Sequence, residues 1–260
     1  MRQSGRGAAW VMACAALGWG CNGADGADGA EPDGSSASSR AGSEVEGQAT
    51  GTTVRSAGSG CRANGGRVPD GAVRAEVVDV DGDGRRDEVW FSPQPTQRFG
   101  VATASGAVVG TTVVTAKPVD GVVVVDADEQ APVEALVRDG ASAHLHVFDR
   151  CQLVPVIGPD GRPYVFDLGY LGRGTGAVCA DADEDGVRDL VGVNAVDNRD
   201  GTATVSRTVV ELDGAVARHG HTDESTIPTG TEPDPLADTM GIRCGDMSIT
   251  AEMLGGGPPG

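Results

Sequence analysis

In DVDGDGRRDEVWF, residues 79–91, a nine-residue acidic loop runs directly into an apolar segment with the composition of a strand. Carboxylates stand at positions 1, 3, 5 and 9 of this loop, a glycine at position 6 and the Arg85 carbonyl at position 7. A hard cation such as Ca²⁺ takes six to eight oxygen ligands at roughly 2.3–2.6 Å, and this spacing brings several oxygens around one point. Without a cation the carboxylates would repel one another. The predicted side-chain ligands are Asp79, Asp81, Asp83 and Asp87.

Two further copies of the loop follow along the chain. DADEDGVRDLV, residues 181–191, keeps every offset, so its predicted ligands are Asp181, Asp183, Asp185, the Val187 carbonyl and Asp189. VVVVDADEQAPVEALV, residues 122–137, has Ala131 in place of the glycine, and we expect it to bind a cation weakly or not at all. Its candidate ligands are Asp126, Asp128, Gln130, Pro132 and Glu134. The loops begin at residues 79, 126 and 181, and a repeat of about 50 residues is typical of propeller blades or solenoids.

Composition limits the class of fold and of function. The 260 residues carry a net charge of −18, with 38 acidic residues against 20 basic ones, which disfavours binding to nucleic acid. The chain has 41 glycines, and its apolar runs are short, rich in valine and bounded by Asp-Gly or Gly-Pro turns. These features predict an all-β fold.

The amino terminus has the pattern of an export signal. Arg2 and Arg6 precede an apolar segment that is too short for a membrane-spanning helix. The segment ends at Cys21, and residues 1–21 resemble a bacterial lipoprotein signal, which implies that Cys21 is lipidated and anchors the protein to a membrane. Plain secretion is the alternative interpretation.

The rest of the chain divides by composition. Residues 22–60 are Gly-, Ser- and Asp-rich with little apolar content, so they predict a disordered tether. The repeat domain is expected over 61–254, with a disordered tail over 255–260. Within the domain, the polar and proline-rich residues 222–239 indicate a long loop.

At the acidic loops the sequence resembles the FG-GAP/VCBS repeats of integrin-like β-propellers and related bacterial surface proteins. The matching segments are VVDVDGDGRRDEVWF and VCADADEDGVRDLVGV, with VVVVDADEQAPVEALV as a degenerate copy. The resemblance implies that each loop joins two adjacent strands of a blade and holds Ca²⁺. It implies a propeller-like array of about three to four blades over roughly residues 61–220.

Four cysteines remain after the signal segment, and an even number in an exported protein predicts disulfides. Three pairings are possible, and we favour Cys151–Cys179 together with Cys61–Cys244. A zinc site is disfavoured because no close Cys-x-x-Cys pair is present.

Other chemistry is weakly supported by the sequence. His144 and His146, like His219 and His221, are two residues apart in predicted strands, where we expect them to face solvent rather than bind zinc or copper. No Gly-x-Ser-x-Gly nucleophile elbow occurs. An EF-hand is excluded because its twelfth loop position would be Trp90 or Gly192.

These observations favour a non-enzymatic, Ca²⁺-stabilised β-repeat module on a bacterial cell envelope that binds a protein or a glycan. An envelope enzyme or accessory subunit acting on polysaccharide is one alternative. A purely structural surface spacer is another. No nucleic-acid partner is expected, and membrane contact is expected only through the lipid on Cys21.

Overall fold

The computed structural model describes residues 58–92, 97–115, 117–169, 174–230, 239–245, 247–250 and 253–254. All of them belong to the unit Thr53–Gly260, and the other unit, Met1–Thr52, lies outside the described residues. The predicted signal at 1–21, the tether up to residue 57 and the tail at 255–260 are therefore also outside them. In the described part of the chain, no helix is long and apolar enough to cross a membrane.

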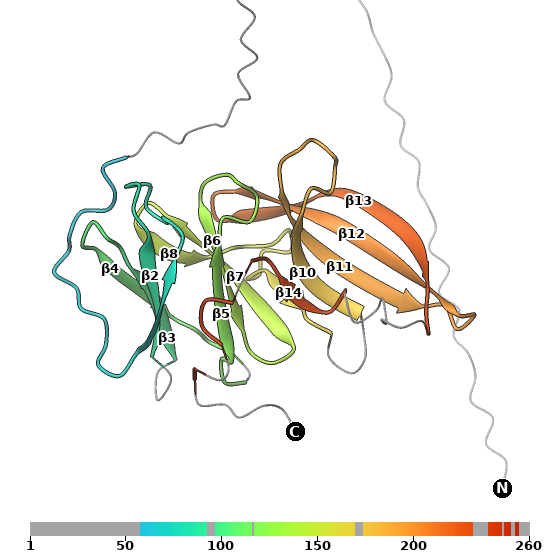
Figure 1. Ribbon diagram of the computed structural model, residues 1–260, viewed down its shortest axis with the longest axis horizontal. Coiled ribbons are helices and arrows are strands. Elements are labelled where there is room, and N and C mark those ends of the chain that lie inside the picture. Colours follow the sequence, from blue (N-terminus) through green and yellow to red (C-terminus); the bar gives the residue numbers. More distant parts are fainter. Residues whose placement is uncertain are drawn as a thin grey trace, which may run out of the picture. The chain divides into compact units, whose positions relative to one another are not determined.

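Every named element in the described residues is a β-strand, and the strands form three sheets (Figure 1). The strand orders are β1-β2-β3-β4, then β5-β6-β7-β8 with β9 paired to β7, and then β13-β12-β11-β10-β14. Their bounds are β1 Val73–Val77, β2 Asp87–Ser92, β3 Arg98–Ala102, β4 Val108–Thr112, β5 Gly121–Val125, β6 Val133–Arg138, β7 Ser142–Asp149, β8 Gln152–Pro155, β9 Val165–Asp167, β10 Gly174–Ala180, β11 Asp189–Asp197, β12 Thr202–Asp213, β13 Val216–Pro228 and β14 Gly241–Arg243. The predicted all-β fold is confirmed, and none of these sheets closes on itself.

Consecutive strands in each sheet are antiparallel neighbours, and β14 is the exception because it runs parallel to β10. Each acidic loop joins the first two strands of one meander: β1 to β2, β5 to β6, and β10 to β11. The three loops therefore occupy equivalent places in three similarly wound sheets.

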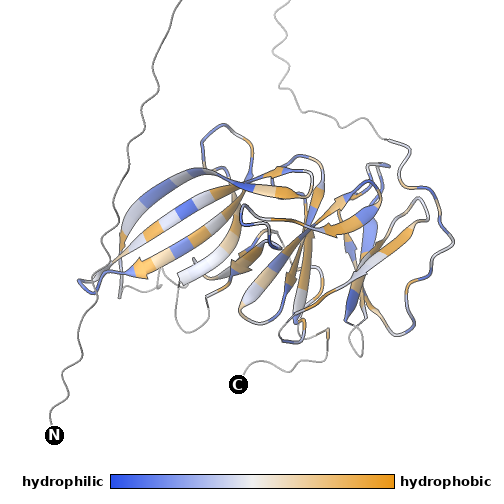
Figure 2. Cartoon of the chain, turned by 180° about the vertical axis from the view of Figure 1, so that it is seen from behind, coloured by the Kyte–Doolittle hydropathy of each residue, from blue (hydrophilic) through white to orange (hydrophobic). Residues whose placement is uncertain are grey.

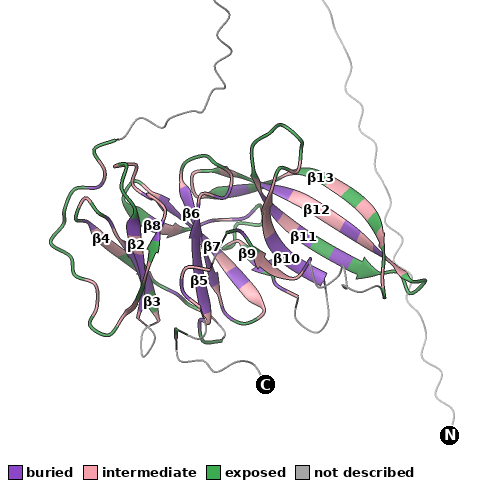
Figure 3. Ribbon diagram, viewed as in Figure 1, coloured by how far each residue is buried: buried purple, intermediate pink, exposed green. Residues whose placement is uncertain are grey.

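The second sheet packs between the other two. Side chains on one face of β5, Val122 and Val124, belong to the core shared with the first sheet, and Val123 and Val125 belong to the core shared with the third. A strand buried on both faces needs a continuous apolar run rather than an alternating one, which explains the sequence VVVV. Figure 3 shows β5 and β6 buried along most of their length.

In the first sheet, one tryptophan fills a space left by two glycines. Trp90 is fully buried on the face of β2 opposite to the core, where it pairs with Gly100 of β3, which in turn pairs with Gly110 of β4. A Cβ atom at Gly110 would lie 2.5 Å from the indole ring. The two glycines therefore make the space that the ring fills.

The third sheet contains the longest strands, and β13 extends to Pro228. The expected long loop at 222–239 is therefore wrong for its first part, while residues 231–238 lie outside the described residues. Cross-strand hydrogen bonds between polar side chains support this part of β13: Ser206 with Glu224 and Thr208 with Thr222. Figure 2 shows hydrophilic and hydrophobic residues interspersed along these strands.

The disulfides join Cys61 to Cys151 and Cys179 to Cys244, so the pairing favoured from the sequence is wrong. Cys61 precedes the first strand and is held against the turn between β7 and β8, which ties the first sheet to the second. Cys179 lies on β10 and Cys244 directly follows β14, its parallel neighbour. Two disulfides indicate an oxidising, extracytoplasmic environment.

Candidate metal sites

Three acidic clusters form at the three loops, and each uses positions 1, 3 and 9. In each cluster, one carboxylate oxygen from every member lies within 4.8 Å of the others. Two oxygens that are each about 2.4 Å from a shared cation can be no more than about 4.8 Å apart, so the spacing suits one hard cation per loop. The clusters are Asp79, Asp81 and Asp87; Asp126, Asp128 and Glu134; and Asp181, Asp183 and Asp189.

The same backbone hydrogen bond positions the ninth carboxylate in all three loops. The backbone N–H at position 2 donates to this carboxylate from Val80 at 2.7 Å, from Ala127 at 2.7 Å and from Ala182 at 2.9 Å. The bond draws the start of each loop toward the first residues of the following strand. The loop ends are thereby fixed before any ligand is added.

Glycine at position 6 completes the first and third loops. Gly84 donates its N–H to Asp79 at 2.8 Å, and Gly186 donates to Asp181 at 3.0 Å. Both glycines have positive φ, 83° and 89°, a region that residues with a Cβ atom rarely adopt. The middle loop has Ala131 at this position, yet its cluster is still assembled.

The structure does not bring position 5 into the clusters. Asp83 instead accepts hydrogen bonds from the backbone and the guanidinium of Arg85, the shortest at 2.6 Å. The hydrogen bond from the Arg85 side chain lowers the pKa of Asp83. Asp185 likewise accepts a bond from the N–H of Val187. Of the side-chain carboxylates expected from the sequence, Asp83 and Asp185 are not members of the clusters. The Gln130 amide and the backbone carbonyls of Arg85, Pro132 and Val187 stay predicted ligands, because the clusters are defined by carboxylates alone.

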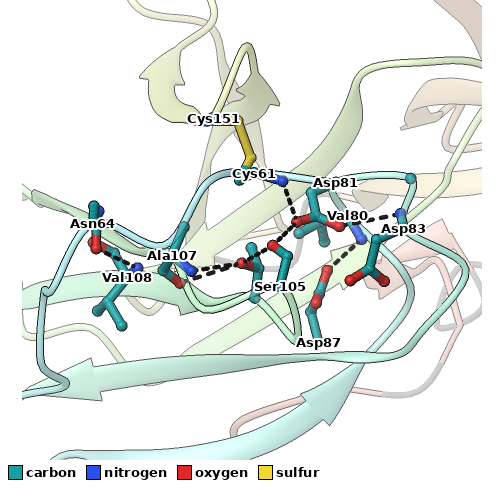
Figure 4. The surroundings of a disulfide bond; sticks show 12 residues. Cys61, Asn64, Val80, Asp81, Asp83, Asp87, Ser105, Ala107, Val108 and Cys151 are labelled. Carbon is teal, nitrogen blue, oxygen red and sulfur yellow. Dashed lines mark hydrogen bonds between the residues drawn. A yellow bond between two sulfur atoms is a disulfide. The ribbon is translucent and has the colours of Figure 1, made fainter. Parts of the chain in front are cut away.

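The first cluster is held by residues that the loop pattern does not contain (Figure 4). Asp81 accepts hydrogen bonds from the backbone N–H of Cys61 at 2.7 Å and from the hydroxyl of Ser105 at 2.6 Å. Asp87 also accepts the backbone N–H of Ala104 at 2.7 Å. The disulfide at Cys61 therefore lies directly beside the first candidate site (Figure 4). Nothing in the sequence signals these contacts, because the donors are 17 to 24 residues away in the chain.

Burial differs among the clusters because of how the sheets stack. Asp87 and Glu134 are 3% and 0% exposed, whereas Asp189 is only partly buried. On β2, Asp87 lies on the same face as Val89, which packs in the core shared with the second sheet. On β6, Glu134 lies on the same face as Leu136, which packs in the core shared with the third sheet. On β11 the corresponding face turns away from the second sheet.

Burial also raises the pKa values of the ninth carboxylates of the first and second loops. It raises the pKa of Asp87, against the opposing effect of the N–H donors from Ala104 and Val80. It raises the pKa of Glu134 to about 8, with a smaller contribution from the negative charges of Asp128 and Asp126. An ionised Glu134 is therefore costly unless a cation accompanies it.

The second and third loops are in direct contact. Arg188, at position 8 of the third loop, donates from Nε to Glu129 at 2.9 Å and from Nη2 to the Asp126 carbonyl at 3.0 Å. Its guanidinium therefore contacts the backbone and the outer rim of the middle loop.

The histidines differ from expectation in one respect. His146 is 7% exposed and packs edge-on against Phe99 at 5.0 Å between ring centroids, so the expectation of a solvent-facing side chain is wrong for it. Burial lowers its pKa to about 4. His144 lies 3.3 Å from Asp139, and His219 and His221 are exposed on β13. None of them joins a metal-type cluster in the described residues.

The arrangement offers oxygen ligands at three equivalent points, which is the chemistry of hard divalent cations rather than of zinc or copper. Such clusters can hold a metal ion. Comparison with known proteins adds no further guide, since no protein-family model, no curated protein and no solved structure matches the chain.

Proposed function

We propose that this protein is a Ca²⁺-stabilised β-repeat binding module of the FG-GAP/VCBS kind, acting outside the cytoplasm on a bacterial cell envelope. The observation that carries the proposal is the recurrence of one oxygen cluster, at loop positions 1, 3 and 9, between the first two strands of three consecutive sheets. A single acidic turn has many explanations, but three in equivalent places point to one shared role.

The role of the cation is structural. Each cluster joins the end of a first strand to the start of a second, so a bound ion fixes the connection and neutralises the carboxylates. The sheets then pack through apolar cores as a propeller-like array of blades and present their loops to a protein or glycan partner. The four-stranded meander of the first two sheets agrees with the blade of a propeller.

The decisive test is thermal unfolding of the full chain under oxidising conditions, first with millimolar Ca²⁺ and then with EGTA. At a concentration 100 times its Kd, each ion adds about 2.7 kcal/mol to the free energy of unfolding. In a domain of this size that amount corresponds to a rise in Tm of about 5–10 °C per site. An equal Tm in both buffers would reduce the loops to ordinary Asp-Gly turns.

The anchor has a separate test. Lipidation of Cys21 predicts that the protein fractionates with membranes and that Cys21→Ser releases it. Membrane retention of the serine variant would count against the lipid anchor and leave the metal sites untouched.

A further inference from the structure

We propose that the middle loop, residues 126–134, is itself a divalent-cation site, with Asp126, Asp128 and Glu134 as its carboxylate ligands. This rests on the proposed function and deepens it, because it assigns an ion and its ligands to the loop whose sequence departs from the repeat pattern. It also reverses the expectation from the sequence, where Ala131 replaces glycine and Gln130 replaces aspartate. The geometry of the buried glutamate carries the proposal.

Glu134 presents a carboxylate to the cluster from a fully buried position. Its side chain is 0% exposed, and one of its oxygens lies within 4.8 Å of oxygens from both aspartates. Oε2 accepts the N–H of Ala127 at 2.7 Å, but Oε1 has no hydrogen-bond partner among the described residues. A buried carboxylate oxygen without a partner is costly, and native proteins satisfy such atoms with an ion or water.

Asp87, the equivalent carboxylate of the first loop, has a hydrogen-bond donor that Glu134 lacks. Asp87 accepts one N–H on each oxygen, from Val80 on Oδ2 and from Ala104 on Oδ1. Glu134 has the first of these donors but no counterpart of the second. A cation bound by Oε1 would supply the missing partner and the missing positive charge together.

Arg188 does not fill this role for Glu134. Arg188 approaches the middle loop from outside, and its hydrogen bonds go to the side chain of Glu129 and to the carbonyl of Asp126. The charged groups that act on Glu134 are Asp128 and Asp126, and both are negative. The positive charge that would compensate an ionised Glu134 is therefore expected to come from solution.

The substitutions in the loop leave the cluster intact. In the first and third loops, position 5 lies outside the cluster, so Gln130 removes no ligand that the other loops use. Glycine at position 6 donates an N–H to the first carboxylate, but the oxygens of the middle loop gather without it.

The test is the number of Ca²⁺ ions bound by the metal-free full chain, measured by equilibrium dialysis at pH 8 and repeated with Mg²⁺. Glu134→Gln, which keeps the size of the side chain, is expected to bind one ion fewer than the wild type. Asp128→Asn, at a less buried position, should lose the same ion and serves as the second variant. Glu129→Gln is the matched control on the same loop and should bind as the wild type does. Circular dichroism confirms that each variant is folded.

A background without the other two sites separates this inference from the proposed function. In the double variant Asp79→Asn, Asp181→Asn, one ion should remain, and adding Glu134→Gln should weaken its binding at least tenfold. If the double variant binds no ion while the wild type does, the middle loop is not a site and the proposed function stands on the other two loops alone. A wild-type chain that binds neither cation would overturn both, and an unchanged ion count in Glu134→Gln would overturn this inference.

Discussion

In cation-free buffer, Glu134→Gln should stabilise the protein at alkaline pH and have little effect in acid. Glu134 is fully buried, and its pKa is raised to about 8 from an ordinary value of 4.5. A raised pKa means that the folded state holds the proton more tightly than the unfolded state. The stability that this provides is therefore complete below pH 4.5 and is lost as the pH rises through 8.

The size of the effect follows from the same shift. One pKa unit corresponds to about 1.4 kcal/mol, so ionising Glu134 in the folded protein costs about 3–5 kcal/mol in the absence of a cation. Glutamine at this position carries no charge, can still accept the N–H of Ala127, and can donate to the neighbouring carboxylates. Glu134→Gln should therefore keep most of the unfolding free energy that the wild type loses at alkaline pH.

The assay is urea unfolding followed by circular dichroism, in EDTA, at pH 5, 7 and 9. Titrating groups that do not interact with Glu134 contribute equally to both proteins. The difference between their unfolding free energies therefore reports Glu134 together with its coupling to Asp126 and Asp128. That difference should grow by about 3–5 kcal/mol in favour of Glu134→Gln between pH 5 and pH 9. Parallel pH profiles for the two proteins would refute the reasoning, since they would mean that the carboxyl group is not held in a low-dielectric site.

Three other perturbations test the fold around the sites. Gly100→Ala should lower the unfolding free energy by about 2–3 kcal/mol in urea titrations, because the new methyl group would overlap the Trp90 ring and the neighbouring strand. Peptide mapping without reduction should recover Cys61 linked to Cys151, and removing this bond with serine at both positions should cost about 3–5 kcal/mol and weaken Ca²⁺ binding at the adjacent loop. Burial lowers the pKa of His146 to about 4, so the stability provided by its neutral side chain is complete above pH 6.5 and is lost as the pH falls through 4. His146→Leu should therefore lose about 2–3 kcal/mol less unfolding free energy on acidification than the wild type does.

The all-β fold and the places of the acidic loops could be predicted because their signals are local. A carboxylate at alternate positions followed by a β-branched run is visible within a dozen residues. The loop at 181–189 and the run at 122–125 are both of this kind, and the structure places them at a turn between strands and in a strand buried on both faces.

What the sequence could not reveal depends on contacts between distant segments. The disulfide partner of Cys61 depends on which sheets pack together, and the residues close to Cys61 in the chain do not indicate this packing. The polar residues 222–228 predict a loop, yet they form the end of β13, because an outer strand can be polar when its side chains pair across to β12. His146 was expected in solvent because alternation alone does not tell which faces of a strand another sheet covers.

The middle loop shows what a pattern confined to one loop leaves out. Residue identity at positions 5 and 6 lowered the expectation of binding there, whereas the structure uses positions 1, 3 and 9 in every copy. The burial of Glu134 depends on the third sheet, which begins about 40 residues later in the chain. A pattern read within one loop cannot contain that information.

Because of the way the sheets stack, each of the first two acidic loops depends on a sheet that comes later in the chain. In the first two sheets, the ninth loop carboxylate lies on the face that the following sheet covers, so its burial depends on strands that emerge later during synthesis. A chain that ended after the second sheet would leave Glu134 exposed to solvent and its apolar neighbours without the third sheet to pack against. Deleting or exchanging a single sheet should therefore change the burial, and with it the pKa, of the ninth carboxylate in the loop before it.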